Sequence, residues 1–386
     1  MTLTELLADE ALRQHEFPVT RTKVFLAHAG VCPIPRRVAE AIRDYALSST
    51  LGDQETLVPA FQMRQTRELA ARLLHANAEE VAFVGPTSLA LSFVAGGLPW
   101  RRGDNIVVYF DDYPANVYPW MALAARGVTV RFLHARQYGC IRPADVMEQV
   151  DEQTRLVALA SCHFVAGFRP DLKAIGQFLR ARGILFCVDA IQTLGAFPTT
   201  VEFIDFVAAD AHKWLLGPCA AGILYVRKEV QAKMRPVAHG WNNVLCPNFV
   251  AQERIEWQPD ARRYEAGSAN LLGLVGLRAA LELIAEMGID DIAAELQRKR
   301  AWFMPAIREK GYEVLSADAR PENASGIMSL YRDGLDMPAL HQRLEESQVI
   351  TSLRTDRQGR HYLRLSPHFY NTDAELQRVL ELLPHT

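Results

Sequence analysis

Cysteine is scarce in this chain of 386 residues, and its six cysteines follow no metal-binding spacing. They form no CxxC pair, and none alternates with histidine as in a zinc site, so we expect reduced thiols and no metal centre. The chain also lacks an apolar run near the roughly 20 residues of a membrane span. Its N-terminus shows no basic leader followed by an apolar core. Together these absences predict a cytoplasmic protein without a membrane anchor.

Runs of one charge are missing too. Lysine and arginine total 42 against 45 aspartates and glutamates, which leaves a net charge of -3. Without a basic patch, we expect no nucleic acid partner. No GxGxxG motif follows an early strand, which argues against a dinucleotide-binding oxidoreductase. The remaining expectation is an enzyme with a small substrate.

Seven apolar runs of strand length occupy the middle of the chain. In order they are VAFVG, NIVVYF, VTVRFL, RLVALAS, ILFCVDA, DFVAA and GILYV, between Val81 and Val226. Helical or polar segments separate most of them, which is typical of a largely parallel sheet covered by helices on both faces. We therefore predict an α/β fold with a mainly parallel seven-stranded sheet sandwiched by helices.

The flanking segments predict helices and a second domain. Residues 1–20 show amphipathic helical spacing, as do Pro35–Leu47 and Pro59–Leu74. After a polar and aromatic stretch, Ser268 can cap a long helix that Gly288 ends. A further helix, strands and a final helix from Asp373 follow. We predict a large domain at 21–265 and a smaller α+β domain made from 1–20 and 266–386.

A carboxylate and a lysine lie at or just after the ends of two of the apolar runs. Asp189 ends ILFCVDA, and Lys213 follows DFVAAD within the tetrad Ala-His-Lys-Trp. An enzyme that uses pyridoxal 5'-phosphate (PLP) needs a lysine for a Schiff base, and an acid that keeps the pyridine nitrogen protonated. This pair therefore predicts PLP as the cofactor.

Several motifs support the same cofactor. HKW is followed by GP and GILYV, with VDAIQ upstream and YEAGSAN and LRLSPHFYNT downstream. In this order the motifs resemble the class V branch of PLP enzymes of fold type I, which includes cysteine desulfurases, cysteine C–S lyases, kynureninase, isopenicillin N epimerase and some aminotransferases. The resemblance covers nearly the whole chain.

The resemblance implies roles for the residues around the cofactor ring. Lys213 matches the Schiff-base lysine, which also moves protons at Cα. Asp189 matches the acid at the pyridine nitrogen, and Gln192 the ligand to the ring hydroxyl. Tyr113 in FDDYPAN matches the side chain that stacks on the ring, although many desulfurases carry histidine there. Arg364 matches the arginine that binds the substrate's α-carboxylate with two parallel hydrogen bonds, which implies an L-amino acid as substrate.

The resemblance also implies phosphate ligands. Thr87 and Ser88 lie between a strand and a helical segment, where a helix N-terminus can hold an anion, and His212 precedes the lysine. Simple N-capping is the alternative for the two hydroxyls. Ser268 corresponds to a hydroxyl that reaches the phosphate from the neighbouring subunit, which implies a homodimer with shared sites. A plain helix cap is the other interpretation.

One departure from the family bears on the reaction. Desulfurases carry a catalytic cysteine shortly before the carboxylate-binding arginine, and here ITSLRTDRQGRHYLRLS contains none. We therefore expect β-elimination of the cysteine-conjugate C–S lyase type, and not persulfide formation by a desulfurase. Transamination and epimerisation are close alternatives, and a non-catalytic relative of the fold is a remote one. Five residues are candidates for binding the substrate's side chain, with packing as the equal alternative: His28, His163, His239, Trp241 and Asn242.

Overall fold

The structure is a computed structural model that describes residues 1–385. Its central sheet has seven strands in the order β2-β8-β7-β6-β5-β3-β4. The strands are β2 (Val81–Val84), β3 (Asn105–Tyr109), β4 (Thr129–Leu133), β5 (Thr154–Ala160), β6 (Leu185–Asp189), β7 (Phe206–Ala209) and β8 (Gly222–Val226). Only β8 runs against its neighbours in this sheet. Each strand coincides with one of the seven apolar runs, and the predicted α/β fold is confirmed.

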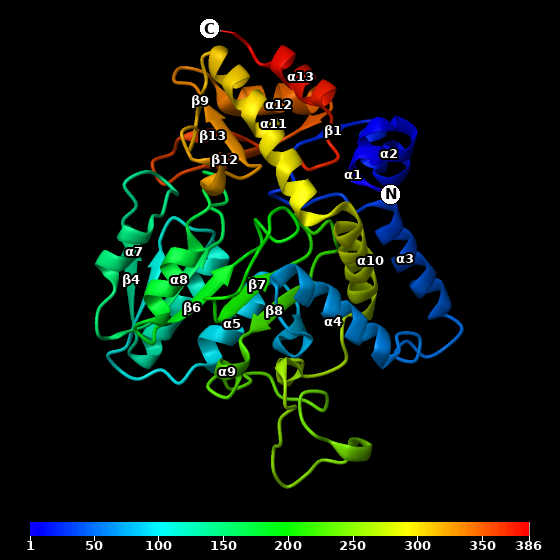
Figure 1. The fold of residues 1–386 in the computed structure, drawn as a ribbon, viewed down its shortest axis with the longest axis vertical. Coiled ribbons are helices and arrows are strands. Elements are labelled where there is room, and N and C mark those ends of the chain that lie inside the picture. Colours follow the sequence, from blue (N-terminus) through cyan, green and yellow to red (C-terminus); the bar gives the residue numbers. More distant parts are fainter. Residues whose placement is uncertain (386) are drawn as a thin grey trace.

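Side chains on both faces of this sheet are buried, which explains why the runs are continuously apolar. Along β5, Val157 and Leu159 pack into one core while Leu156 and Ala158 pack into another, because successive residues point to opposite faces. Helices from both sides close these cores (Figure 1). The first is covered by α4 (Ala60–Leu74), α8 (Leu172–Arg180) and α10 (Leu271–Met287), and the second by α5 (Thr87–Gly97), α6 (Tyr118–Met121) and α9 (Lys228–Gln231).

A second, antiparallel sheet has the strand order β12-β13-β10-β9. Its strands are β9 (Glu313–Val314), β10 (Met328–Tyr331), β12 (Ser352–Thr355) and β13 (His361–Leu365). The helices around it are α11 (Ile289–Glu309), α12 (Met337–Glu346) and α13 (Asp373–Leu382). β1 (Val24–Phe25) pairs in parallel with β11 (Val349–Ile350) beside it. The remaining helices are α3 (Arg36–Ser48), α7 (Pro143–Gln149) and the N-terminal α1 (Leu3–Ala8) and α2 (Glu10–Glu16).

The N-terminal segment forms two helices, whereas the sequence predicted one over residues 1–20. The break falls at Asp9, whose side chain accepts a hydrogen bond of 3.0 Å from the backbone N–H of Leu12 and so caps α2. An aspartate at this position favours a new helix start over continuation of α1, because its carboxylate satisfies a free N–H of the first turn.

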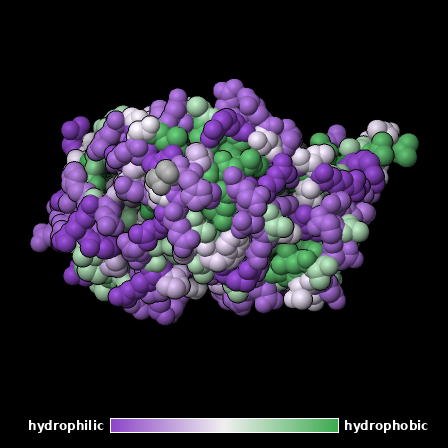
Figure 2. Space-filling view, turned by 90° about the horizontal axis from the view of Figure 1, so that it is seen from above, coloured by the Kyte–Doolittle hydropathy of each residue, from purple (hydrophilic) through white to green (hydrophobic). Residues whose placement is uncertain are grey.

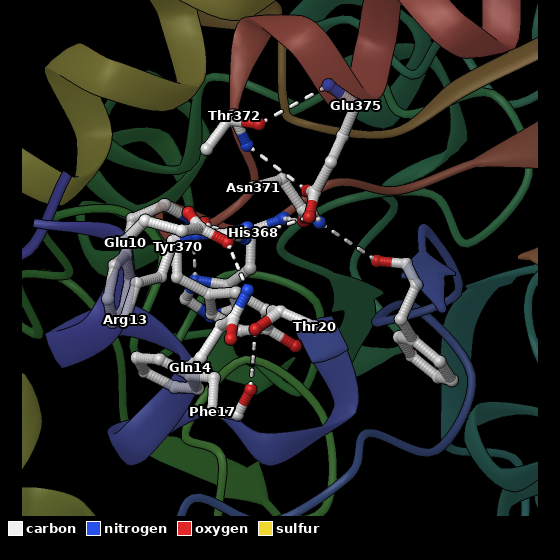
Figure 3. Close-up of polar contacts among 12 residues, drawn as sticks. Glu10, Arg13, Gln14, Phe17, Thr20, His368, Tyr370, Asn371, Thr372 and Glu375 are labelled. Atoms are coloured by element: carbon white, nitrogen blue, oxygen red, sulfur yellow. Dashed lines mark hydrogen bonds and ion pairs between the residues drawn. The ribbon is translucent and has the colours of Figure 1, made fainter. Parts of the chain in front are cut away.

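The two ends of the chain are joined by polar contacts (Figure 3). Arg13 of α2 donates hydrogen bonds to the backbone carbonyl of Tyr370 at 3.2 Å and to the carboxylate of Glu375 at 2.8 Å. The rings of Phe17 and Tyr370 stack with their centres 3.9 Å apart. These contacts support the grouping of residues 1–20 with the C-terminal part, although the division into two domains stays a prediction. Among residues 1–385, no helix has the length and apolarity needed to cross a bilayer, and the cytoplasmic location stays a prediction.

Candidate active site

The residues predicted to hold the cofactor lie in loops at one edge of the central sheet. Asp189 ends β6, and Lys213 follows the end of β7 by four residues. Tyr113 follows β3 in the same way, and α5 begins at Thr87 just beyond β2. The carboxyl ends of parallel strands meet at one edge, which is where ligands bind in open α/β sheets. The topology therefore brings residues far apart in the sequence to one place.

Lys213 is buried, with only 7% of its surface exposed. Its Nζ lies 5.2 Å from the centre of the Tyr113 ring. Burial lowers the pKa of this amine to about 8, an effect that the nearby charge of Asp189 partly offsets. An amine with a lowered pKa is neutral more often near pH 7 to 8, which is the form that attacks an aldehyde.

Asp189 is also buried, and it accepts a hydrogen bond of 3.0 Å from the backbone N–H of Ile191. Burial raises the pKa of this carboxyl to about 6, opposed by the hydrogen bond from Ile191 and by the charge of Lys213. A protonated ring nitrogen would supply the positive partner that a buried carboxylate needs.

Gln192 is held between two protein groups. Its amide nitrogen donates to the carbonyl of Ala29 at 3.1 Å, and its amide oxygen accepts from the indole N–H of Trp214 at 2.9 Å. One amide N–H remains for another acceptor. This N–H is available to the ring hydroxyl, and the contact stays a prediction.

The predicted phosphate ligands gather at the start of α5. Pro86 precedes this helix, and no side chain caps its first turn. The hydroxyl of Thr87 accepts a hydrogen bond of 2.9 Å from the backbone N–H of Asp210, while Ser88 is exposed. Because Thr87 and Ser88 do not cap the helix, the capping alternative is wrong, and the free N–H groups of the first turn suit an anion. His212 donates from Nδ1 to Asp210 at 2.8 Å.

Arg364 is a buried cation without a carboxylate partner among residues 1–385. Its Nη1 donates to the carbonyl of Phe164 at 2.7 Å, and its Nη2 lies 3.4 Å from the hydroxyl of Ser352. Its Nε has no hydrogen-bond partner in this part of the chain. Burial lowers the pKa of the guanidinium to about 9. An unpaired buried charge is costly, so this geometry fits an anionic ligand.

Ser268 bonds to a residue outside the Lys213 loop. It is exposed, and its hydroxyl donates to Glu55 at 2.8 Å. The interpretation of Ser268 as the cap of the long helix is wrong. Asn270 caps α10 instead, by accepting a hydrogen bond of 3.1 Å from the N–H of Gly273. A contact with the phosphate of a second subunit stays a prediction.

Two of the histidine candidates for substrate binding are core residues. His28 is fully buried between the carbonyl of Ser366 and the hydroxyl of Tyr370, and burial lowers its pKa to about 4. His163 accepts from the N–H of Ala166 at 3.0 Å and its Nε2 donates to a backbone carbonyl, with its pKa lowered to about 4 by burial. Both rings are committed to structural hydrogen bonds.

The other three candidates lie in the segment after β8. The ring of His239 is 5.4 Å from that of Trp257, and the ring of Trp241 is 5.3 Å from that of Phe249. Asn242 donates to the carbonyl of Glu265 at 3.1 Å. These contacts are packing contacts within the segment, so the structure gives no support to substrate binding by these side chains.

Sequence reasoning missed three charged residues near the site. Asp210 bonds to both Thr87 and His212, and Asp112 is a buried carboxyl whose pKa is raised to about 7 by burial and by the charge of Asp189. Both aspartates follow a buried strand, and the end of a buried strand is also the sequence signal that indicates Asp189. The third, Arg354, has a different position. The register of β12 and β13 places it on the same sheet face as Arg364.

The hairpin between β12 and β13 closes over the loop that carries Tyr113. Arg357 at its tip forms an ion pair with Asp111, and its guanidinium lies 3.7 Å from the centre of the Phe110 ring. This hairpin is the segment before Arg364 that contains no cysteine. It is a short turn that is docked onto the large sheet.

These groups fit PLP. The site offers an amine for the aldehyde, a buried carboxylate for the ring nitrogen, a tyrosine beside the amine, a free helix N-terminus for the phosphate and an unpaired arginine for an amino acid. The roles of the individual residues stay predictions.

Comparisons with known proteins give the family. The model of the aminotransferase class V family matches residues 24–379. A probable cysteine desulfurase of Methanothermobacter thermautotrophicus is 30% identical over 398 residues, which cover 96% of each chain. An uncharacterised aminotransferase of Bacillus subtilis is 28% identical and covers 95% of each chain. The structure of a cysteine desulfurase from Thermococcus onnurineus matches with a TM-score of 0.88 at 22% identity, over 97% of this chain and 96% of that one.

The expected reaction needs correction. Exclusion of a cysteine desulfurase in favour of a C–S lyase is contradicted, because the relative aligned over 96% of the chain is named a probable cysteine desulfurase. The missing cysteine excludes a sulfur-accepting thiol between Thr351 and Ser366, but it does not exclude release of sulfur from the substrate. The match over residues 24–379 confirms the expected enzyme class and its cofactor: this chain belongs to the aminotransferase class V family and is a PLP-dependent enzyme.

Proposed function

We propose that this enzyme is a cysteine desulfurase, which removes the sulfur of L-cysteine and leaves L-alanine. The observation that carries the proposal is the buried guanidinium of Arg364, which has no carboxylate partner in the described chain and whose charge acts on the buried amine of Lys213. The relatives named as cysteine desulfurases support the choice of substrate.

Each residue has a chemical role in this proposal. Bound PLP supplies the sink for the electron pair that is left at Cα of the substrate. Arg364 binds the α-carboxylate through its fork of N–H groups and so orients the Cα–H bond. Lys213 removes the proton from Cα and returns protons to the carbon skeleton. Asp189 keeps the ring nitrogen protonated, and Tyr113 packs beside the amine.

The sulfur passes to a thiol that is not part of the hairpin between β12 and β13. In balanced form, L-cysteine and a thiol RSH give L-alanine and the persulfide RSSH. The hairpin contains no cysteine, and its tip is docked through Arg357 onto Asp111 and Phe110. We therefore place the acceptor thiol on another part of the chain or on a molecule that comes to the site.

The test is product analysis. Full-length enzyme loaded with PLP is incubated with L-cysteine and dithiothreitol, and alanine, sulfide, pyruvate and ammonia are measured. Alanine and sulfide in equal amounts support the proposal. Pyruvate and ammonia without alanine contradict it. Lys213→Ala is the inactive control.

A second candidate function is transamination. The relative from Bacillus subtilis that aligns over 95% of this chain is named an aminotransferase, and Lys213, Asp189 and Arg364 serve that reaction equally well. The two activities differ in cofactor fate. An aminotransferase leaves the amino group on the cofactor until a 2-oxo acid is added, so accumulation of pyridoxamine phosphate with L-cysteine, reversed by pyruvate, identifies it.

We also propose that two copies of the chain form the working enzyme. Ser268 lines an open groove of about 730 Å³ together with Phe61, Arg64 and Trp241. Arginines in this groove, including Arg64, can receive the phosphate of a second copy or its acidic side chains.

Exposed apolar side chains lie on the two segments that contribute Glu55 and Trp241 to this groove. Leu51, Phe249 and Ile255 are exposed by 91%, 77% and 62%. The segment after β8 projects from the body at the bottom of Figure 1, and the projection at the right of Figure 2, where the connection between α3 and α4 lies, ends in apolar atoms. Apolar patches on projecting segments are typical of protein interfaces. Sedimentation of the purified protein tests this, and a fully active monomer contradicts it.

A further inference from the structure

Asp210 occupies the turn between β7 and Lys213 and is 3% exposed. Its Oδ1 accepts hydrogen bonds from the backbone N–H groups of Ala211 at 2.8 Å and Ala221 at 3.0 Å. Its Oδ2 accepts from the N–H of Ala220 at 3.0 Å and from Nδ1 of His212 at 2.8 Å. One carboxylate therefore joins the turn that carries Lys213 to the return loop before β8.

The backbone of the same residue reaches the other side of the site. The N–H of Asp210 donates to the hydroxyl of Thr87 at 2.9 Å, in the first turn of α5. Because this hydroxyl accepts from Asp210, its own proton is free to donate elsewhere. The helix N-terminus, the histidine and the lysine turn are thus fixed to a single residue.

The return loop needs this support. Leu216 and Ala220 both adopt left-handed backbone conformations, with φ of 59° and 60°. Such conformations are strained for residues other than glycine and persist only where the surroundings enforce them. The hydrogen bond from the N–H of Ala220 to Asp210 holds the strained residue in place.

The contact also selects one tautomer of His212. Because the carboxylate accepts at Nδ1, that nitrogen carries the proton, and Nε2 is turned away from Asp210. No hydrogen bond to Nε2 is found among residues 1–385. Nε2 is therefore the nitrogen that remains to face a ligand.

A comparison with Asp205 separates this arrangement from an ordinary buried ion pair. Asp205 immediately precedes the first residue of β7. It accepts a hydrogen bond from the N–H of Phe186 at 2.8 Å and forms an ion pair with Arg227 at 2.7 Å. Asp210 has no lysine or arginine within ion-pair distance in the described chain. Its one ionisable partner is the imidazole of His212. The carboxylate of Asp210 instead accepts hydrogen bonds from the Lys213 turn and from the return loop.

We propose that Asp210 is a positioning residue that fixes Thr87, His212 and the Lys213 turn in the geometry that binds the cofactor's phosphate. The inference deepens the proposed site and rests on its location, but not on which amino acid is the substrate. It makes Asp210 act through its neighbours and gives it no contact with the reacting atoms.

The experiment uses Asp210→Asn with Asp205→Asn as the matched control. In the variant the amide nitrogen replaces an oxygen at Oδ1 or Oδ2, so one pair of donors loses its acceptor. Dissociation constants for PLP are measured with full-length protein. The tautomer of His212 is read from the ¹⁵N shifts of labelled histidine, and the signal is assigned with His212→Gln.

We expect Asp210→Asn to weaken PLP binding by about tenfold or more, the loss that corresponds to one buried hydrogen bond. We also expect the proton of His212 to move from Nδ1 to Nε2. Asp205→Asn should lower thermal stability while leaving PLP affinity and the His212 signal unchanged. Wild-type PLP affinity in Asp210→Asn, or an equal loss in both variants, overturns the proposal.

Two safeguards keep the test decisive. If Asp210→Asn does not fold, Asp210→Ser is measured instead, since its hydroxyl accepts one backbone N–H but is too short to hold the imidazole in the same way. The wild-type protein alone also decides, because a His212 that is unprotonated at Nδ1 contradicts the inference. Neither measurement depends on turnover, so failure of the desulfurase assay leaves this result intact.

Discussion

The guanidinium of Arg364 donates to the backbone carbonyl of Phe164 at 2.7 Å, and its Nε has no partner among residues 1–385. One edge of the fork is therefore anchored, Nη2 has only the contact of 3.4 Å with the hydroxyl of Ser352, and Nε is free. Phe164 also packs its ring edge-on to Tyr113 with the ring centres 5.4 Å apart. The loop after β5 thus orients both the arginine and the tyrosine.

Replacement of this arginine tests its role in binding the carboxylate. We expect Arg364→Gln to raise KM and lower kcat, with kcat/KM falling by a hundredfold or more, since a charge-assisted pair is worth about 1.5–3 kcal/mol and orientation is lost as well. Arg354→Gln, on the same sheet face, is the control and should have the smaller effect. Equal losses in the two variants would contradict the assignment.

Chemical trapping tests Lys213. Borohydride reduction of the PLP-loaded enzyme should attach the cofactor to the peptide that contains Lys213. Lys213→Ala should show no attachment, and its turnover should fall by about a thousandfold or more, because general acid–base catalysis alone contributes about 10²–10⁴. A cofactor found on any other lysine would refute the site.

The lowered pKa of Lys213 predicts how cofactor attachment depends on pH. Only the neutral amine attacks an aldehyde, so the attachment rate in the cofactor-free protein should rise with pH, with a midpoint near the pKa of about 8 and not near 10.5. Asp189 raises the pKa of Lys213, so Asp189→Asn should move the midpoint lower. Stopped-flow absorbance measures both, and a midpoint above pH 10 would count against the burial of the amine.

The strained return loop predicts a stabilising substitution. Ala220 has a φ of 60°, so Ala220→Gly should raise the free energy of unfolding by about 1 kcal/mol, because glycine adopts this conformation without a steric cost. Ala221→Gly, at a neighbouring position without positive φ, should instead lower it by about 0.5–1 kcal/mol. Urea denaturation compares the two, and a loss in both variants would show that the loop is not strained.

Much of the fold was predictable because its strongest signals are local. The central strands are buried on both faces, so each leaves a continuous apolar run, and Asp189 stands where such a run ends. The wrong predictions concern where a helix begins, because neighbouring residues can each cap it. Asn270 caps α10 where Ser268 also could, and Asp9 divides a segment whose apolar spacing is continuous.

The parts of the site that sequence reasoning missed depend on tertiary contacts. Asp210 carries the same strand-end signal as Asp189, but two of its four acceptor contacts come from a loop that returns ten and eleven residues later. His28 was a reasonable candidate because histidine is a common ligand. Its burial against Ser366 and Tyr370 could not be read from positions more than 300 residues away.

The contact between Arg13 and Glu375 spans 362 residues and sets an order in which the protein can be completed. The last strands and α13 leave the ribosome long after α2, which until then can pair only with nearby segments such as α3, through Glu16 and Arg37. Arg364 is made in the same final stretch, so a nascent chain that already has Lys213 and Asp189 still lacks the predicted group for the substrate's carboxylate. If Arg364 has the predicted role, we expect activity to begin only once the stretch that contains Arg364 has been made and folded.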